Sequence, residues 1–179
     1  MMAKTATWRG MTPADLPAVN AIAAVVHAAY PEDPAVFAER LALYPDGCFV
    51  LETANGLAGY LVSHPWHVMQ PPALNALLGS MPQPASTYYL HDIALLPQAR
   101  GGGAAGTVLT MVFDHAAAVA DNVSLVAVGG TAPFWGRYRF APHDTPSLAR
   151  KLQSYGKDAS YMVRSLSADH AAGSTISLE

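Results

Sequence analysis

Residues 97–106 read Pro97-Gln98-Ala99-Arg100-Gly101-Gly102-Gly103-Ala104-Ala105-Gly106. This glycine-rich stretch follows a strand-like apolar run at 88–96 and opens a helix-like run at 107–120. A turn of this kind presents several backbone N–H groups at a helix N-terminus, where the helix dipole favours negative charge. Arg100 adds a cation that suits the same ligand. The stretch therefore predicts a site for a phosphate or pyrophosphate group.

The runs around this turn have the order of a layered α/β (α+β) domain. Apolar runs bounded by turn residues predict strands at 6–11, 48–53, 57–63, 88–96, 123–128 and 160–166. Helical spacing, capping residues and prolines predict helices at 13–30, 35–43, 73–78, 107–120 and 132–138. Asn55-Gly56, between two strand runs, indicates a hairpin. We expect a mixed, mostly antiparallel sheet of six to seven strands, flanked by helices.

Composition limits the class of protein. The chain has 179 residues, of which 51% are hydrophobic and 13% charged, so we expect one folded domain over 1–166. The small polar residues of 167–179 predict a flexible tail. A net charge of -3 without basic runs argues against nucleic-acid binding. No apolar run approaches the roughly 20 residues of a membrane span. With one cysteine, Cys48, and no signal-peptide pattern, we expect a cytoplasmic protein.

Two phosphate-binding patterns fit the glycine stretch poorly. A P-loop requires Gly-Lys-Ser/Thr, but Thr107 follows Gly106 here without a lysine. The dinucleotide fingerprint G-x-G-x-x-G is formally present, but it also requires an acidic residue at the end of the next strand. The strand expected at 123–128 runs instead into Gly129-Gly130. A dinucleotide-binding oxidoreductase is therefore the weaker alternative.

The stretch resembles motif A of the GNAT superfamily of acyl-CoA-dependent N-acyltransferases. That motif, Gln/Arg-x-x-Gly-x-Gly/Ala, is matched after the strand by Arg100-Gly101-Gly102-Gly103-Ala104-Ala105. A register starting at Gln98 fits as well, but the position of Pro97 favours Arg100. A second segment resembles the family's Phe-Tyr-x-x-x-Gly-Phe pattern and reads Phe134-Trp135-Gly136-Arg137-Tyr138-Arg139-Phe140. The order of elements over residues 6–166 agrees as well.

The resemblance implies acetyl-CoA or another acyl-CoA as co-substrate. The backbone amides of Gly101, Gly102, Gly103, Ala104 and Ala105, with Arg100, would hold its pyrophosphate. The backbone of Ile93, Ala94 and Leu95 would line the pantetheine arm and polarise the thioester carbonyl. The acceptor it implies is a primary amine, and without a charged docking surface we expect a small molecule.

Direct acyl transfer needs a base for the amine and an acid for the thiolate. Asp92 is the preferred base and His91 the second choice, and alternation along the strand places them on opposite faces. Structural hydrogen bonding within the sheet is the alternative role for both. The family's acid is a tyrosine at the position of Trp135, and indole does not release a proton near neutral pH. Tyr138 is the substitute, and packing against the core is its alternative and favoured role. An acyl-CoA-binding module without turnover is therefore a second hypothesis.

The connection 64–86 is rich in proline and carries His64 and His67. It either walls the acceptor pocket or builds a homodimer contact. With no third ligand evident, the two histidines do not predict a metal site. Cys48 lies in an apolar strand run and is expected in the core.

Overall fold

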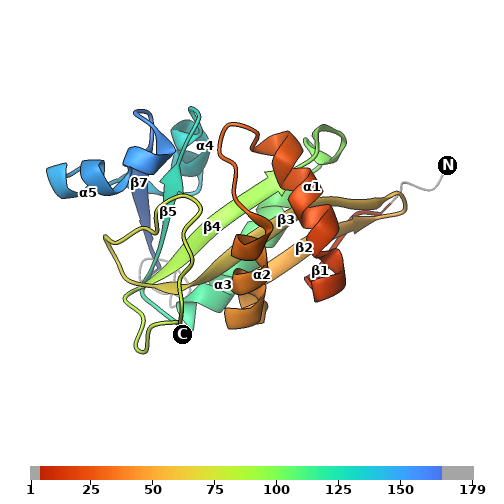
Figure 1. The fold of residues 1–179 in the computed structure, drawn as a ribbon, viewed down its shortest axis with the longest axis horizontal. Helices are drawn as coiled ribbons and strands as arrows, with labels where there is room; N and C mark the ends of the chain where they lie inside the picture. The colour runs from red at the N-terminus through yellow and green to blue at the C-terminus, as the bar shows by residue number, and fades with distance from the viewer. Residues whose placement is uncertain (1–4, 167–179) are drawn as a thin grey trace, which may run out of the picture. The chain divides into compact units, whose positions relative to one another are not determined.

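A computed structural model describes residues 5–166 (Figure 1). Its strands are β1 (Thr7–Gly10), β2 (Cys48–Thr53), β3 (Gly56–Trp66), β4 (Thr87–Leu95), β5 (Asn122–Ala127), β6 (Ala141–Pro142) and β7 (Ser160–Ser165). Its α-helices are α1 (Leu16–Val26), α2 (Pro34–Leu43), α3 (Ala104–Ala117), α4 (Ala132–Arg137) and α5 (Pro146–Lys151). In this part of the chain, seven strands form one sheet in the order β1-β2-β3-β4-β5-β7-β6. The predicted mixed, mostly antiparallel sheet is confirmed.

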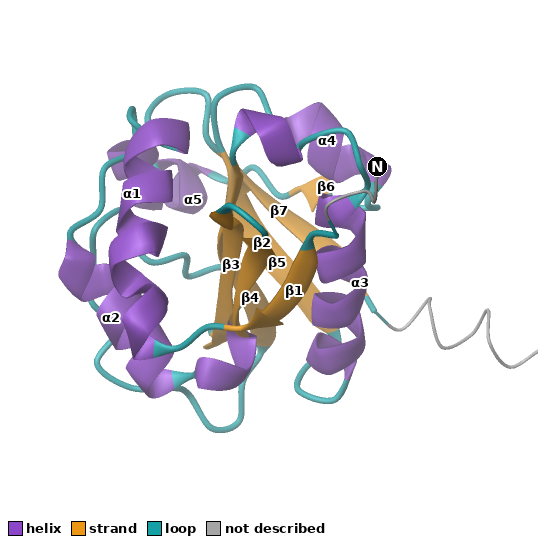
Figure 2. Ribbon diagram, turned by 90° about the vertical axis from the view of Figure 1, so that its right-hand side faces the viewer, coloured by secondary structure: helices purple, strands orange, loops and turns teal. Residues whose placement is uncertain are grey.

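The described chain groups into two compact units, and the first comprises residues 5–64, 72–81 and 90–112. Here β1 pairs antiparallel with β2, and β2 with β3 in the predicted hairpin, where Thr53 faces Gly56. Gly56 has a φ of +105°, which glycine adopts without strain. Figure 2 shows α1 and α2 on one side of these strands and α3 on the other.

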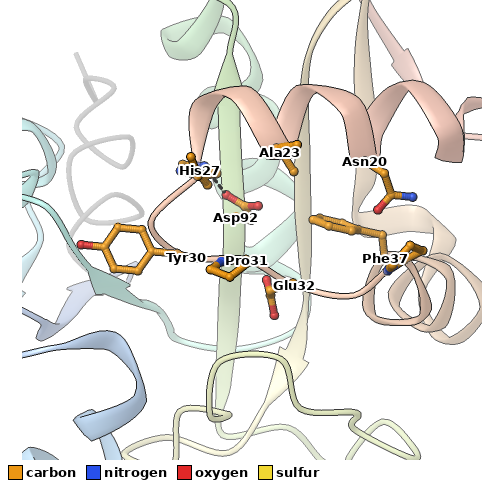
Figure 3. A pocket seen from close by; sticks show the side chains of 11 residues that line it. Asn20, Ala23, His27, Tyr30, Pro31, Glu32, Phe37 and Asp92 are labelled. Atoms are coloured by element: carbon orange, nitrogen blue, oxygen red, sulfur yellow. Dashed lines mark ion pairs between the residues drawn. The ribbon is translucent and has the colours of Figure 1, made fainter.

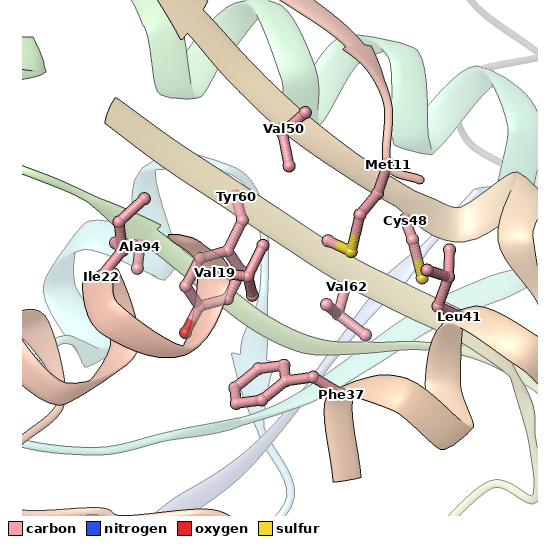
Figure 4. Packing of buried hydrophobic residues seen from close by; sticks show 10 residues of the cluster. All are labelled: Met11, Val19, Ile22, Phe37, Leu41, Cys48, Val50, Tyr60, Val62 and Ala94. Carbon is pink, nitrogen blue, oxygen red and sulfur yellow. The ribbon is translucent and has the colours of Figure 1, made fainter. Parts of the chain in front are cut away.

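The core of the first unit fills the space between α1, α2 and the sheet (Figure 4). Helical spacing and strand alternation place its members on facing surfaces: Met11, Val19, Ile22, Phe37, Leu41, Cys48, Val50, Tyr60, Val62 and Ala94. Tyr60 and Phe37 meet edge to face, with ring centroids 5.5 Å apart. The expected burial of Cys48 is confirmed. This core fixes α1 and α2 over strands β2, β3 and β4.

The second unit comprises residues 65–71, 82–89 and, as described, 113–166. The start of β4 pairs parallel with β5 through Tyr88↔Val123 and Tyr89↔Ser124, and β5 pairs antiparallel with β7. A separate cluster of buried residues is formed by Tyr89, Leu148, Leu152 and Tyr161. The second unit also contains β6 and α5, neither of which the sequence patterns predicted.

Three predicted elements need correction. α1 ends at Val26 rather than at residue 30, because the chain turns at His27, whose side chain bonds to β4. α3 begins at Ala104, three residues before the predicted start, so the glycines directly precede it. Residues 73–78 form no helix, since the backbone of 75–79 bonds to side chains of Glu32 and Glu39. The tail predicted at 167–179 lies outside the described residues.

Candidate active site on strand β4

The glycine loop forms the entry to α3, as the sequence predicts. Gly101 and Gly103 have φ angles of +82° and +83°, a region that side-chain-bearing residues rarely adopt. Gly101, Gly102 and Gly103 are exposed, while Ala104 and Ala105 are half-buried in the first turn of the helix. The first N–H groups of any α-helix have no acceptor within the helix. At the start of this 14-residue helix, the loop therefore offers backbone donors and a favourable dipole to an anion.

Three contacts hold this loop against the strands of the first unit. The indole of Trp8 on β1 donates to the Ala104 carbonyl at 2.9 Å. Arg100, which is exposed, donates from Nε to the Leu95 carbonyl at 3.0 Å. The amide of Leu96 donates to the Ala58 carbonyl on β3 at 2.8 Å. The position of Arg100 at the loop is thus set from the end of β4.

A pocket of about 370 Å³ lies in the first unit beside the middle of β4 (Figure 3). Small side chains of α1, among them Ala23 and Ala24, form one wall. Phe37 and Pro31 add apolar surface, and Asp92 of β4 reaches in from the sheet. Its volume falls near the lower end of the range for small-molecule sites, about 300–1,000 Å³.

Asp92, the residue predicted as base, is held by two partners. Its Oδ1 lies 2.8 Å from Nε2 of His27, the residue at the C-terminal end of α1. Its Oδ2 accepts a hydrogen bond from the buried Tyr60 hydroxyl. Burial and the neighbouring Asp92 carboxylate keep the pKa of Tyr60 far above its ordinary value, so Tyr60 remains a donor. The side chain of Asp92 is 14% exposed and lines the pocket together with His27.

His27 is a functional candidate that the sequence did not single out. Its Nε2 also lies 3.1 Å from the Ile93 carbonyl, which can only accept. Nε2 must therefore carry a proton, and the basic lone pair of the neutral ring is on Nδ1. Burial lowers the pKa of His27, but the hydrogen bond and the charge of Asp92 outweigh it and raise the pKa above its ordinary value. The His27–Asp92 pair thus has the arrangement of a base oriented by a carboxylate.

His91 pairs with Glu32, from the connection between α1 and α2. Its Nε2 lies 2.9 Å from Glu32 Oε1, and the side chains are 2% and 7% exposed. Burial raises the pKa of Glu32, yet the hydrogen bond and charge of His91 bring it below its ordinary value. Alternation predicted His91 and Asp92 on opposite faces of the strand. That prediction is wrong here, because both side chains bond to the segment that contains His27 and Glu32.

Ile93, Ala94 and Leu95, the other residues predicted for the donor side, form the end of β4. Ala94 is buried in the core, and its carbonyl faces Gly59 of β3, where a Cβ would lie 2.8 Å from that oxygen. The absence of a side chain at Gly59 therefore allows β3 to approach β4 closely. This approach supports the strand segment that carries Ile93 and Leu95.

Trp135 and Tyr138 belong to the second unit. Trp135 is buried and packs edge to face against Phe134 and Phe140. Tyr138, at the end of α4, is half-buried, with its ring 5.3 Å from that of Phe134 and 6.5 Å from that of Phe113. Its side chain therefore packs against aromatic rings, as one of the two sequence-based interpretations has it.

The two histidines of the 64–86 connection pack against other rings. His64 is fully buried, with its ring 6.3 Å from that of His91, while His67 belongs to the second unit and packs against Trp66. Among residues 5–166, no group of three or more His, Cys, Asp and Glu side chains is placed to hold a metal ion. No helix of the same range has the length and apolarity needed to cross a membrane.

Comparison with solved structures places this fold among known ones. Ard1 from Thermoplasma volcanium superposes with a TM-score of 0.66 at 15% identity, over 89% of this chain and 97% of its own. A GNAT-like decarboxylase, GphF, in complex with isobutyryl-CoA gives 0.67 at 18%, over 89% and 99%. Arabidopsis thaliana Naa50, in complex with the bisubstrate analogue CoA-Ac-MVNAL, gives 0.65 at 14%, over 89% and 98%. At such identities the likeness shows the fold.

The sequence itself gives the family. Comparison with curated proteins finds no match. The model of the acetyltransferase (GNAT) family, however, matches residues 17–133, a range that includes most of α1 and all of β4, the glycine loop and β5. Because this match spans more than half of the 179 residues, the chain belongs to the acetyltransferase (GNAT) family, as the resemblance predicted.

Proposed function

We propose that this protein is an enzyme that transfers an acetyl or short acyl group from acyl-CoA to the primary amine of a small molecule. One observation carries the proposal. A single strand, β4, ends in a glycine loop suited to an anion and, a few residues earlier, places Asp92 in a pocket with His27. A donor site and a proton-accepting site on one strand are what direct acyl transfer requires.

On the donor side, the backbone of Gly101 to Ala105 is the proposed pyrophosphate site, with Arg100 as its cation. Exposed glycines let a ligand approach the backbone closely. Ile93, Ala94 and Leu95 are the proposed contacts for the pantetheine arm. The complexes of GphF with isobutyryl-CoA and of Naa50 with a CoA-containing analogue support acyl-CoA as the co-substrate.

On the acceptor side, the His27–Asp92 pair is the proposed base. An amine arrives as its ammonium and gives one proton to Nδ1 of His27, whose positive charge Asp92 stabilises. The amine lone pair then forms the N–C bond at the thioester carbon, the nitrogen releases its second proton to solvent, and the C–S bond breaks to leave the CoA thiolate. The thiolate takes up a proton in turn, for which Tyr138 remains the proposed donor. His91, the second choice for the base, is bonded to Glu32 and is assigned here to positioning.

Ligand-induced stabilisation separates this function from its alternatives. Acetyl-CoA and CoA should raise the melting temperature, because a ligand that binds only the folded state stabilises it. NADH and NADPH should not. Stabilisation by a dinucleotide alone would overturn the proposal. Release of CoA thiol in the presence of primary amines then separates an enzyme from an acyl-CoA-binding module, which would bind acetyl-CoA without releasing thiol.

A further inference from the structure

The pocket beside Asp92 has walls that are largely apolar. Ala23 and Ala24 of α1 leave space where larger side chains would fill it, and Phe37 and Pro31 close the opposite wall (Figure 3). Ala24 is exposed, so it lies at the edge of the space rather than in the core. An occupant of this pocket must bring apolar surface, since burying apolar area is the main favourable term that such walls offer.

The acidic side chains in the pocket lining are two carboxylates, beside the imidazole of His27. Glu32 and Asp92 both line the pocket, and the lining contains no lysine or arginine. The lowered pKa of Glu32 keeps its carboxylate ionised at neutral pH. The side chains paired with these acids are imidazoles, His27 with Asp92 and His91 with Glu32. A ligand with one positive charge is therefore attracted to this end, while a ligand carboxylate meets two acids.

We propose that the acceptor is a compact primary monoamine with an apolar body, whose ammonium lies at Glu32 and Asp92 and whose hydrocarbon part lies between α1 and Phe37. This assignment rests on the proposed function, and it narrows that function to one class of amine. An α-amino acid of the same shape is rejected because it brings a carboxylate to the two acids. A diamine of the same length is disfavoured because its second ammonium would lose water against apolar walls.

The size of the pocket also argues against a peptide. A volume of about 370 Å³ holds a small molecule, and each further residue of a peptide would add backbone amides that need hydrogen-bonding partners. On the helical wall Ala23 and Ala24 supply none, and Asn20 offers a single amide. The amine group of a protein N-terminus therefore fits the charges of this pocket but not its walls.

Matched pairs of amines test the assignment directly. We expect kcat/KM for phenethylamine to exceed that for phenylalanine by about 100-fold or more, because the two differ by one carboxylate. Butylamine should exceed 1,4-diaminobutane by about tenfold, because the two differ by one ammonium. Equal rates within either pair, or preference for a short peptide over phenethylamine, would overturn the proposal.

Two variants locate the effect in the pocket. Ala24→Leu adds bulk at the pocket wall on a helix that accommodates leucine, so KM for phenethylamine should rise about tenfold or more. Val25→Leu is the control, because Val25 is 66% exposed and is absent from the lining. Glu32→Gln should reduce the preference for phenethylamine over phenylalanine. Glu32→Gln also removes an acceptor of the Asn75 amide. If that variant does not fold, the comparison of Ala24→Leu with Val25→Leu still tests the assignment.

Calorimetry without acyl-CoA separates this assignment from the proposed function. If acetyl-CoA stabilises the protein but phenethylamine binds no better than phenylalanine, the pocket assignment is wrong while the donor site stands. If phenethylamine binds selectively and loses affinity in Ala24→Leu while acetyl-CoA does not bind, the pocket assignment stands and acyl transfer is wrong.

Discussion

Replacing Asp92 by asparagine tests the proposed base most directly. The carboxylate accepts from His27 Nε2 at 2.8 Å and from the Tyr60 hydroxyl, whereas an amide has a single acceptor oxygen. Nε2 must remain a donor because it also faces the Ile93 carbonyl at 3.1 Å. The amide oxygen therefore has to face His27, and the amide nitrogen faces Tyr60. Only one orientation of the new side chain satisfies the site.

This geometry sets the size of the loss in stability and of the loss in kcat that we expect for Asp92→Asn. The Tyr60 hydroxyl loses its acceptor, which costs about 1–3 kcal/mol, so the variant should fold with reduced stability. Base catalysis by a positioned side chain contributes about 10²- to 10⁴-fold. Because the Ile93 carbonyl still holds the same tautomer of His27, we expect a loss of kcat near the lower end, about 100-fold. If His27 also lost the tautomer with the proton on Nε2, the loss of kcat would be about 10⁴-fold.

The pH profile gives a second, independent readout. Asp92 raises the pKa of His27, and the neutral ring that accepts a proton prevails only above that pKa. Removal of the Asp92 charge lowers the pKa of His27. The acid limb of kcat therefore moves to lower pH in Asp92→Asn, while the plateau falls.

Thiol release at saturating acetyl-CoA, followed against pH, measures the plateau of kcat and the position of its acid limb. Stabilisation of the variant by acetyl-CoA in thermal melts shows that cofactor binding is intact. His27→Gln removes the proton acceptor itself, so it should lose activity toward the upper end of this range and should flatten the acid limb. Full activity of Asp92→Asn with an unmoved limb would refute the reasoning. Loss of activity in His91→Gln, with Asp92→Asn active, would transfer the base to His91.

Three further predictions concern the loop, a cap and a close approach. Gly102→Glu should weaken acetyl-CoA binding by about tenfold or more, measured by calorimetry, because it brings a negative charge to the anion site; Gly102→Ala is the control, since a Cβ there meets nothing within 4 Å. Asp15 precedes α1 and accepts hydrogen bonds from Arg9 and from the Thr12 amide, each at 2.8 Å, so Asp15→Ala should lower the free energy of unfolding in urea by about 1–3 kcal/mol. The bond from Arg9 lowers the pKa of Asp15 to about 2, so this contribution is present at neutral pH and is lost as the pH falls through that value; a pH-independent difference would contradict it. Gly59→Ala should destabilise the fold by about 1–3 kcal/mol in thermal melts, whereas Gly10→Ala, with open space at its Cβ, should not.

Local patterns predicted the strand, the glycine turn and the helix of the proposed donor site. A strand, a glycine turn and a helix follow one another within 87–117, so their relation depends on contacts close in sequence. The positive φ angles of Gly101 and Gly103 are what such a turn demands. The start and the end of the helix each lie three residues earlier than predicted. The start was misplaced because Ala104 and Ala105 can serve equally as the end of a loop or as the first turn of a helix.

The acceptor side was only partly predictable. Asp92 stood out as a polar residue in an apolar strand, but its partner His27 is 65 positions away and looks like any histidine near a helix end. The prediction that α1 continues to residue 30 hid the turn that brings His27 to β4. The helix predicted at 73–78 failed for a similar reason, since the carboxylates of Glu32 and Glu39 come from a distant segment. Such competition between distant side chains and local hydrogen bonds leaves no periodic signal.

Two ion pairs of opposite sense tie the α1–α2 connection to β4. In one the connection supplies the histidine, His27, and the strand the acid, Asp92; in the other the connection supplies the acid, Glu32, and the strand the histidine, His91. Because Glu32 is both an anchor of the connection and a wall of the pocket, its loss should affect the position of His27 as well as the recognition of the amine. Ala24 has no bonded role in either pair, so a change there isolates recognition from the position of the base. We therefore expect Ala24→Leu to change the selectivity among amines and to leave the acid limb of kcat unmoved. Glu32→Gln should change both. This pair of results would show that Glu32 supports both the pocket and the position of His27.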